Sequence, residues 1–151
     1  MAHLERWKFK DGHQEDYAMV TMAVGKNAPN KRDDVLLVQY LLKRIYEKPV
    51  YKNGCLSRPR GVMVVDGYVG AITLDWIKTF QLDMRTWGYS VLVDGRVDPS
   101  TGGQDSTISN TTYTIFGLGD AFKTHYPEIH ANYVNHPDVP AEVRASLARR
   151  A

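Results

Sequence analysis

A mainly α-helical fold is predicted by two features of the sequence. Apolar residues recur at helical spacing in several segments, and a short Val-Asp-Gly turn that occurs twice separates some of these segments. The chain of 151 residues has the length of one domain, and its 43% hydrophobic content suits a globular core. We therefore expect residues 1–151 to form a single domain.

The first predicted helix lies in the segment VLLVQYLLKRIYEK, residues 35–48. Val35, Val38 and Leu42 recur at helical spacing, and further apolar residues widen this face. The polar residues 30–34 supply candidates for the N-cap, and Pro49 ends the helix.

A second helix is predicted after the first Val-Asp-Gly turn. Thr73 is the expected N-cap, because its hydroxyl oxygen can accept from the first free N–H groups of the helix. Ile77, Phe80 and Met84 form an apolar stripe, and Gly88 marks the end of the helix.

A third helix is predicted after a polar, glycine-rich loop. Ser109 or Asn110 can cap it, and its apolar face consists of Ile115, Leu118 and Phe122. Gly117 and Gly119 weaken this helix, so we expect a packing or conformational reason for them.

The two ends of the chain are predicted to differ in structure. Residues 1–30 can form a short hairpin or an irregular arm, with a turn at Asp11 and Gly12. Residues 139–150 indicate a last helix with Pro140 in its first turn, whose narrow apolar face predicts a position at the surface.

The residues of the first turn all have structural roles available to them. Asp66 can accept from backbone N–H groups ahead of it, and Gly67 and Gly70 can adopt positive φ. Asp94 occupies the equivalent place in the second turn, which favours a shared structural role over an acid/base pair of carboxylates. The sequence contains neither GxxxxGK(S/T) nor GxGxxG, the two glycine-rich patterns that bind phosphate, so we do not expect a phosphate site.

Charge and composition exclude several classes of partner. The formal net charge of +2 and the scattered basic residues argue against nucleic acid, and no apolar run is long enough to span a membrane. The N-terminal residues do not form a classical secretory signal, so we expect synthesis in the cytoplasm and, for action in the periplasm or cell wall, nonclassical export. Cys55 is the only cysteine, which excludes an intrachain disulfide.

Three histidines near the C-terminus raise the question of a metal site. His125, His130 and His136 are five and six residues apart, which does not place them on one face of a helix, and Pro127 interrupts the segment. We therefore predict neither a metal nor a cofactor. A metal-dependent cell-wall hydrolase that uses these histidines is the least favoured hypothesis.

The order of the helices and turns resembles the peptidoglycan-binding domain-like family of small three-helix modules in bacterial cell-wall proteins. Four residues of the first helix match its pattern, namely Val35, Val38, Gln39 and Leu42. The central motif matches at Asp66, Gly67, Val69, Gly70, Thr73, Ile77, Phe80 and Gln81, and Asp94 and Gly95 form the second turn. Trp76 stands where the family has a small residue.

This resemblance implies a compact orthogonal three-helix bundle over residues 25–122. The N-terminal residues 1–24 are then an extended arm, and residues 126–151 are an additional C-terminal helical extension. The family implies a noncatalytic module that binds bacterial peptidoglycan. The alternative is a protein-interaction role, as an adaptor or effector component of a bacterial secretion or toxin-delivery system with the same fold.

Aromatic and basic residues near the second helix are the candidate ligand-binding residues. Flat aromatic faces and directional polar groups suit sugars and peptides. The candidates are Tyr68, Trp76, Arg85, Trp87 and Tyr89. The competing interpretation is that the two tryptophans are buried packing residues.

Overall fold

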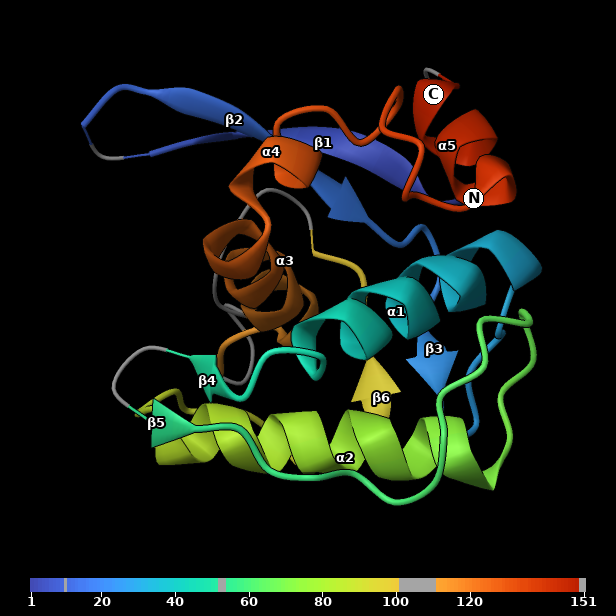
Figure 1. Cartoon of the computed structure of the whole chain (residues 1–151), viewed down its shortest axis with the longest axis vertical. Helices are drawn as coiled ribbons and strands as arrows, with labels where there is room; N and C mark the ends of the chain where they lie inside the picture. The colour runs from blue at the N-terminus through green and yellow to red at the C-terminus, as the bar shows by residue number, and fades with distance from the viewer. Residues whose placement is uncertain (10, 52–53, 101–110, 150–151) are drawn as a thin grey trace.

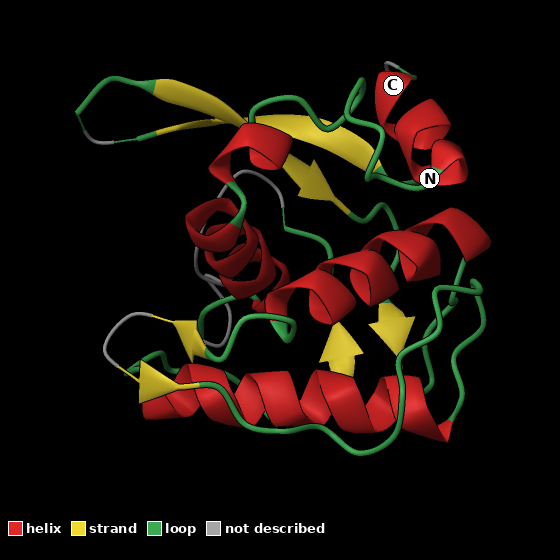
Figure 2. Cartoon of the chain, in the orientation of Figure 1, coloured by secondary structure: helices red, strands yellow, loops and turns green. Residues whose placement is uncertain are grey.

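The computed structural model describes residues 1–151 except 10, 52–53, 101–110 and 150–151 (Figure 1). Within that part of the chain, five helices pack with three small two-stranded antiparallel sheets (Figure 2). The helices are α1 (Arg32–Ile45), α2 (Ala71–Thr86), α3 (Thr114–His125), α4 (Pro127–His130) and α5 (Ala141–Ala148). The fold is mixed α/β, so the prediction of a mainly α three-helix bundle is wrong.

The N-terminal hairpin is the largest departure from a helical bundle. Strands β1 (His3–Lys8) and β2 (Gln14–Met19) pair antiparallel, which confirms the predicted hairpin. The indole ring of Trp7 stacks on Tyr17 at 4.8 Å and on Phe116 of α3 at 5.1 Å between ring centroids. Because these rings are buried, the hairpin belongs to the same core as the helices.

The other two sheets are too short to be detected by alternation of apolar and polar residues. β3 (Val24–Gly25) pairs with β6 (Arg96–Val97), and β4 (Val50–Tyr51) pairs with β5 (Gly54–Cys55). The β3–β6 pair lies between α1 and α2 in Figure 1 and joins the N-terminal region to the second turn.

Helix α1 runs through the centre of the protein, and every residue from Asp34 to Leu42 is buried. Its N-cap is Lys31, which lies within the predicted residues 30–34 but makes no capping bond through its side chain. The carboxylate of Asp34 instead accepts from the backbone N–H groups of Thr21 and Met22 at 3.0 and 3.1 Å. It thereby ties the helix to the end of the hairpin.

The N-cap of helix α2 lies three residues earlier than predicted. This N-cap is Gly70 with φ −114°, so positive φ at Gly70 and an N-cap at Thr73 are both wrong. The end of the helix is confirmed: Gly88 has φ +96°, and the N–H groups of Gly88 and Tyr89 donate to the carbonyls of Arg85 and Met84. These are the two bonds of a Schellman motif.

Close packing explains the two glycines of α3. A Cβ at Gly117 would lie 2.5 Å from Met84 Cε, and one at Gly119 would lie 2.8 Å from Tyr17 Cδ1. The N-cap of α3 is Tyr113, whereas the predicted caps Ser109 and Asn110 fall outside the described residues.

The last helix, α5, closes the fold over the N-terminus. Pro140 is its N-cap, and its apolar residues Val143 and Leu147 are buried. The hydroxyl of Ser146 donates to the carbonyl of Ala2 at 2.6 Å and to the carboxylate of Asp33 at 3.0 Å. Figure 1 accordingly shows the N-terminus beside α5.

Each Asp-Gly turn is held by a buried glutamine from the preceding helix. Gln39 Nε2 donates to Asp66 Oδ1, Tyr68 O and Thr73 Oγ1, while its Oε1 accepts from the N–H groups of Asp66 and Gly67. The side chain of Gln39 is therefore the centre of the first turn.

The second turn repeats this arrangement. Gln81 Nε2 donates to Asp94 Oδ1, Arg96 O and Thr114 Oγ1, and its Oε1 accepts from the N–H of Gly95. Gly67 and Gly95 both have positive φ, +82° and +71°. The predicted equivalence of the two turns is confirmed and extends to the helices on both sides of each turn.

Candidate functional site

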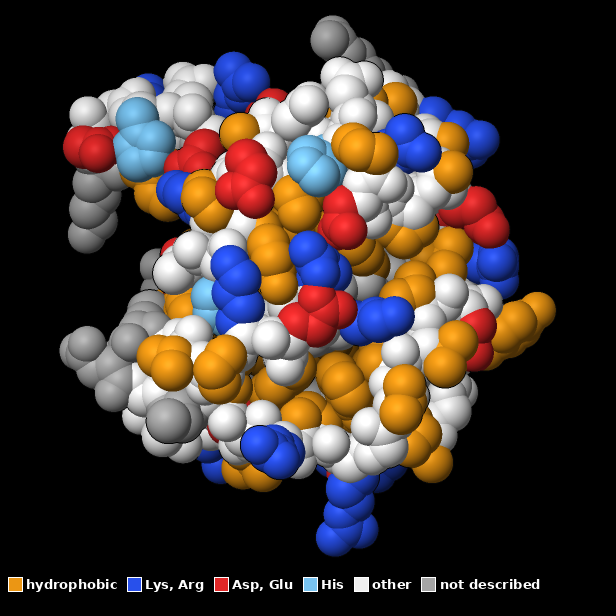
Figure 3. Space-filling view, viewed as in Figure 1, with side chains coloured by type: hydrophobic (Ala, Val, Ile, Leu, Met, Phe, Trp, Pro, Cys, Tyr) orange, Lys and Arg blue, Asp and Glu red, His pale blue; other side chains and the backbone are white. Residues whose placement is uncertain are grey.

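A groove lies between the C-terminal end of α1 and the segment 56–61, which runs along α2. It has a volume of about 440 Å³, and the aromatic side chains of Tyr46 and Trp76 line it together with Leu56. Figure 3 shows apolar side chains in the hollowed surface between α1 and this segment. The rest of the lining consists of Glu47, Pro49, Ser57, Arg58, Pro59 and Gly61.

Internal hydrogen bonds hold the aromatic side chains of the groove in place. Trp76 Nε1 donates to the carbonyl of Arg60 at 2.7 Å, and Tyr46 Oη donates to Asp83 Oδ2 at 2.6 Å. The two rings meet edge to face with centroids 5.6 Å apart. Their polar atoms are thus used within the protein, and the groove presents the apolar parts of both rings.

Asp83 also fixes the loop that forms the other wall. Its carboxylate accepts from the backbone N–H of Ser57 at 3.2 Å and from the Ser57 hydroxyl at 2.5 Å. Burial and this carboxylate raise the pKa of Tyr46 far above its ordinary value, so the phenol stays protonated as a donor. Because one buried carboxylate orders both walls, the groove is formed before any ligand binds.

The charges at the rim are not equivalent. Glu47 forms an ion pair with Arg44. Arg58 is exposed and has no carboxylate partner among the residues that the structure describes. The groove therefore combines an apolar floor with one cation that is available to an anionic ligand group.

The five predicted ligand-binding residues do not come together in one site. Trp76 lines the groove, although only 8% of its surface is exposed. Tyr68 is 74% exposed and borders a different pocket, beside Ile72. Arg85, Trp87 and Tyr89 lie at the opposite end of α2, whose 16 residues span about 24 Å.

The residues at that far end have structural contacts. Trp87 is half-buried and packs edge to face on Tyr51, with centroids 4.5 Å apart. Arg85 Nε donates to the carbonyl of Val91 at 2.9 Å. The packing interpretation of the tryptophans thus describes Trp87, whereas Trp76 both packs and lines a groove.

The carboxylates of Asp66 and Asp94 serve their own turns. Asp66 Oδ1 accepts from the N–H of Tyr68, and Asp94 Oδ1 accepts from the N–H of Arg96, both at 3.0 Å. The bond from the Tyr68 N–H and that from Gln39 lower the pKa of Asp66. These contacts confirm the predicted structural role of the two aspartates.

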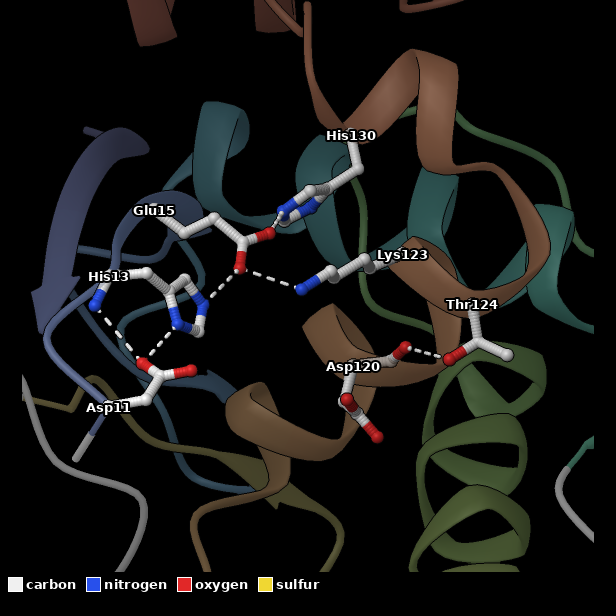
Figure 4. A network of polar contacts seen from close by, with 7 residues as sticks. All are labelled: Asp11, His13, Glu15, Asp120, Lys123, Thr124 and His130. Carbon is white, nitrogen blue, oxygen red and sulfur yellow. Dashed lines mark hydrogen bonds and ion pairs between the residues drawn. The ribbon is translucent and has the colours of Figure 1, made fainter. Parts of the chain in front are cut away.

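A separate polar network joins the hairpin to α3 and α4 (Figure 4). Glu15 of β2 lies at its centre, with Oε1 at 2.8 Å from His130 Nε2 and Oε2 at 2.6 Å from Lys123 Nζ and 3.2 Å from His13 Nε2. His13 in turn contacts Asp11 at the turn of the hairpin. The network anchors the hairpin, and none of the pockets described above includes it.

The three C-terminal histidines are dispersed. His125 Nε2 contacts the carbonyl of Val50 at 2.8 Å, His130 contacts Glu15, and His136 Nδ1 accepts from the N–H of Asp138. No group of three or more His, Cys, Asp or Glu side chains in the described part of the chain is arranged to hold a metal ion. The hydrolase hypothesis therefore gains no support from their positions.

Acidification is expected to destabilise the protein through His130. Burial lowers the pKa of His130 despite the nearby Glu15 carboxylate, so the fold favours the neutral imidazole. Stability from this preference is present above the ordinary histidine pKa of about 6.5 and is lost as the pH falls below it. Burial disfavours the ionised form of Glu15, but its hydrogen bonds outweigh this and lower its pKa, so protonation of Glu15 destabilises the fold at still lower pH.

We expect the variant His130→Gln to lose less stability than the wild type between pH 7 and pH 5, because the burial that lowers the pKa of His130 no longer acts on a titrating group. Urea denaturation at several pH values measures this difference. His13→Gln is the control, because the pKa of exposed His13 is raised by its bond to Asp11 and its contribution has the opposite sign. An unchanged pH dependence in His130→Gln would contradict the assignment.

Sequence reasoning missed most of the groove. Tyr46 falls within the first predicted helix, and no sequence pattern marks Leu56 or Arg58 as a site residue. The one signal that pointed to this place was Trp76, a large residue where a small one was expected.

Comparison with family models, curated proteins and solved structures finds no match. The resemblance to the peptidoglycan-binding domain-like family therefore rests on the matched sequence positions alone. No helix within the described residues is long and apolar enough to cross a membrane.

Proposed function

We propose that the protein is a noncatalytic module that binds bacterial peptidoglycan in the groove of Tyr46 and Trp76. The observation that supports this most is the combination of two fixed aromatic rings with Arg58, which has no carboxylate partner among the described residues. The matched turn motif around Gln39 and Gln81 supports the same proposal.

The chemistry of the groove suits this polymer. The apolar faces of sugar rings and the methyl groups of N-acetyl and lactyl substituents can contact Tyr46, Leu56 and Trp76. The peptide stems carry carboxylates, which the guanidinium of Arg58 can bind in a bidentate manner. A fixed groove loses little conformational entropy when it binds such a ligand.

Co-sedimentation with insoluble peptidoglycan sacculi tests the proposal. We expect the wild type to sediment with sacculi and Arg58→Glu to bind about tenfold more weakly, since ~1.4 kcal/mol corresponds to this factor. Lys78→Glu is the matched control: Lys78 is exposed on α2 beside Gly95 and does not line the groove. Wild-type protein that stays in the supernatant would refute the proposal. An equal loss of binding in both variants would show that the groove is not the binding site.

The protein-interaction alternative is favoured by a different surface. Val62, Val64 and Tyr68 are exposed together near the first Asp-Gly turn. Clustered exposed apolar side chains are typical of protein contacts.

A further inference from the structure

The segment 62–65 has the side-chain alternation of a strand but belongs to no sheet. Val62 and Val64 are 76% and 59% exposed, whereas Met63 between them is 2% exposed and Val65 is half-buried. Gly61, with φ +70°, bends the chain before the segment, and the turn at Asp66 follows it. The segment thus presents one apolar row to solvent while the other row packs on the core.

The backbone of this segment is unpaired. The carbonyl of Val64 accepts from the N–H of Asp66 at 3.1 Å, and the remaining backbone N–H and C=O groups of residues 62–65 make no hydrogen bond with described residues. Valine-rich extended segments with free backbone groups pair readily with another strand. The segment therefore has the properties of an open strand edge.

The side chains around the segment extend this surface. Tyr68 and Ile72 are exposed beside it and line a pocket of about 240 Å³ with the two valines. Figure 3 shows apolar side chains projecting at the edge of the molecule where this segment lies. Arg60 and Asp66, both exposed, stand at its two ends with opposite charge.

We propose that residues 62–65 pair antiparallel with the same residues of a second copy of this chain, across a two-fold axis at Met63. In this register Val62 lies opposite Val64 of the second copy, and each Arg60 end meets the Asp66 end of the other copy. The surface is self-complementary in apolar contacts and in charge, as a two-fold interface requires. These features identify a second copy as the partner.

The dimer is expected to be weak. Four paired residues with Tyr68 and Ile72 bury less surface than a standard stable interface of about 1,600 Å². We therefore expect a dissociation constant of roughly 10⁻⁵ M or above. High salt should weaken the dimer further, because the charges at its ends are exposed.

Sedimentation velocity over a range of protein concentrations tests the dimer with the full chain. We expect the wild type to become dimeric as its concentration rises and Val64→Lys to remain monomeric, because the new charges would face Val62 of the other copy. Leu82→Lys is the matched control: Leu82 is 53% exposed on α2 and is expected to leave the dimer intact. A wild type that is monomeric at all concentrations, or a dimer that Val64→Lys does not affect, would overturn the proposal.

Oxidative cross-linking tests the register. In a Cys55→Ser background, a mixture of Val62→Cys and Val64→Cys chains should cross-link more completely than either chain alone, because opposite residues in an antiparallel pair have their Cβ atoms about 5 Å apart. Equal cross-linking in the mixture and in the separate chains would exclude this register. Neither experiment depends on Arg58, so its outcome is independent of peptidoglycan binding.

Discussion

Gly25→Ala is expected to destabilise the protein by about 3 kcal/mol or more. Gly25 has φ +121°, and a Cβ added there would lie 2.0 Å from the carbonyl oxygen of Gly95. This oxygen belongs to the backbone and accepts from the N–H of Lys26 at 3.0 Å. No side-chain rotation can relieve the clash, so β3 and β6 must separate. Urea denaturation measures the loss.

Gly12→Ala is the matched control for this substitution. Gly12 also has positive φ, +90°, but a Cβ there would meet nothing within 4 Å. We expect it to cost only the left-handed backbone penalty, about 1 to 2 kcal/mol. If the two variants lose equal stability, the close approach of Gly25 to Gly95 is not what constrains this position.

The helices were predictable because their signals are local. In α1 the apolar residues from Val35 to Ile45 recur over three turns, and in α2 Gly88 supplies the positive φ that ends the helix. The residues at which the helices begin were less predictable. Thr73 has the chemistry of an N-cap, yet its hydroxyl accepts from Gln39, which lies 34 residues earlier in the chain.

The β3–β6 sheet was hidden because its pairing is not local. β3 and β6 are each two residues long and about 70 residues apart, so neither alternation nor a hairpin turn marks them. The hairpin of β1 and β2 has a local turn, and it was predicted as a possibility. Its role in the core depends on the stacking of Trp7 on Phe116, which sequence spacing does not reveal.

The predicted ligand-binding residues do not form one site, for a related reason. Tyr68 and Tyr89 both lie close to the second helix in the sequence, but the whole length of α2 separates them in the structure. The groove instead joins Tyr46, the loop at Arg58 and Trp76, which Asp83 and the carbonyl of Arg60 hold together through tertiary hydrogen bonds. Only the structure shows these partners.

Substitution of either buried glutamine, Gln39 or Gln81, is also expected to reduce the stability of the protein strongly. We predict that Gln39→Leu and Gln81→Leu each destabilise the protein by about 2 to 4 kcal/mol. Leucine has a similar size but leaves the N–H of Gly67 or Gly95 and the acceptors of each turn without their partner. An unsatisfied buried polar group costs about 1 to 3 kcal/mol, and each glutamine serves several.

Gln14→Leu on the exposed start of β2 is the control for the change in side-chain chemistry, and we expect it to alter the free energy of unfolding by at most about 0.5 kcal/mol. Because the hydrogen bonds of Gln39 and Gln81 match nearly one for one, the two substitutions should reduce the free energy of unfolding by similar amounts. Gln39 also accepts from the N–H of Asp66, so its loss should be the larger. A loss near that of Gln14→Leu at either position would show that its turn forms without the glutamine, and the two turns would then not be energetically equivalent.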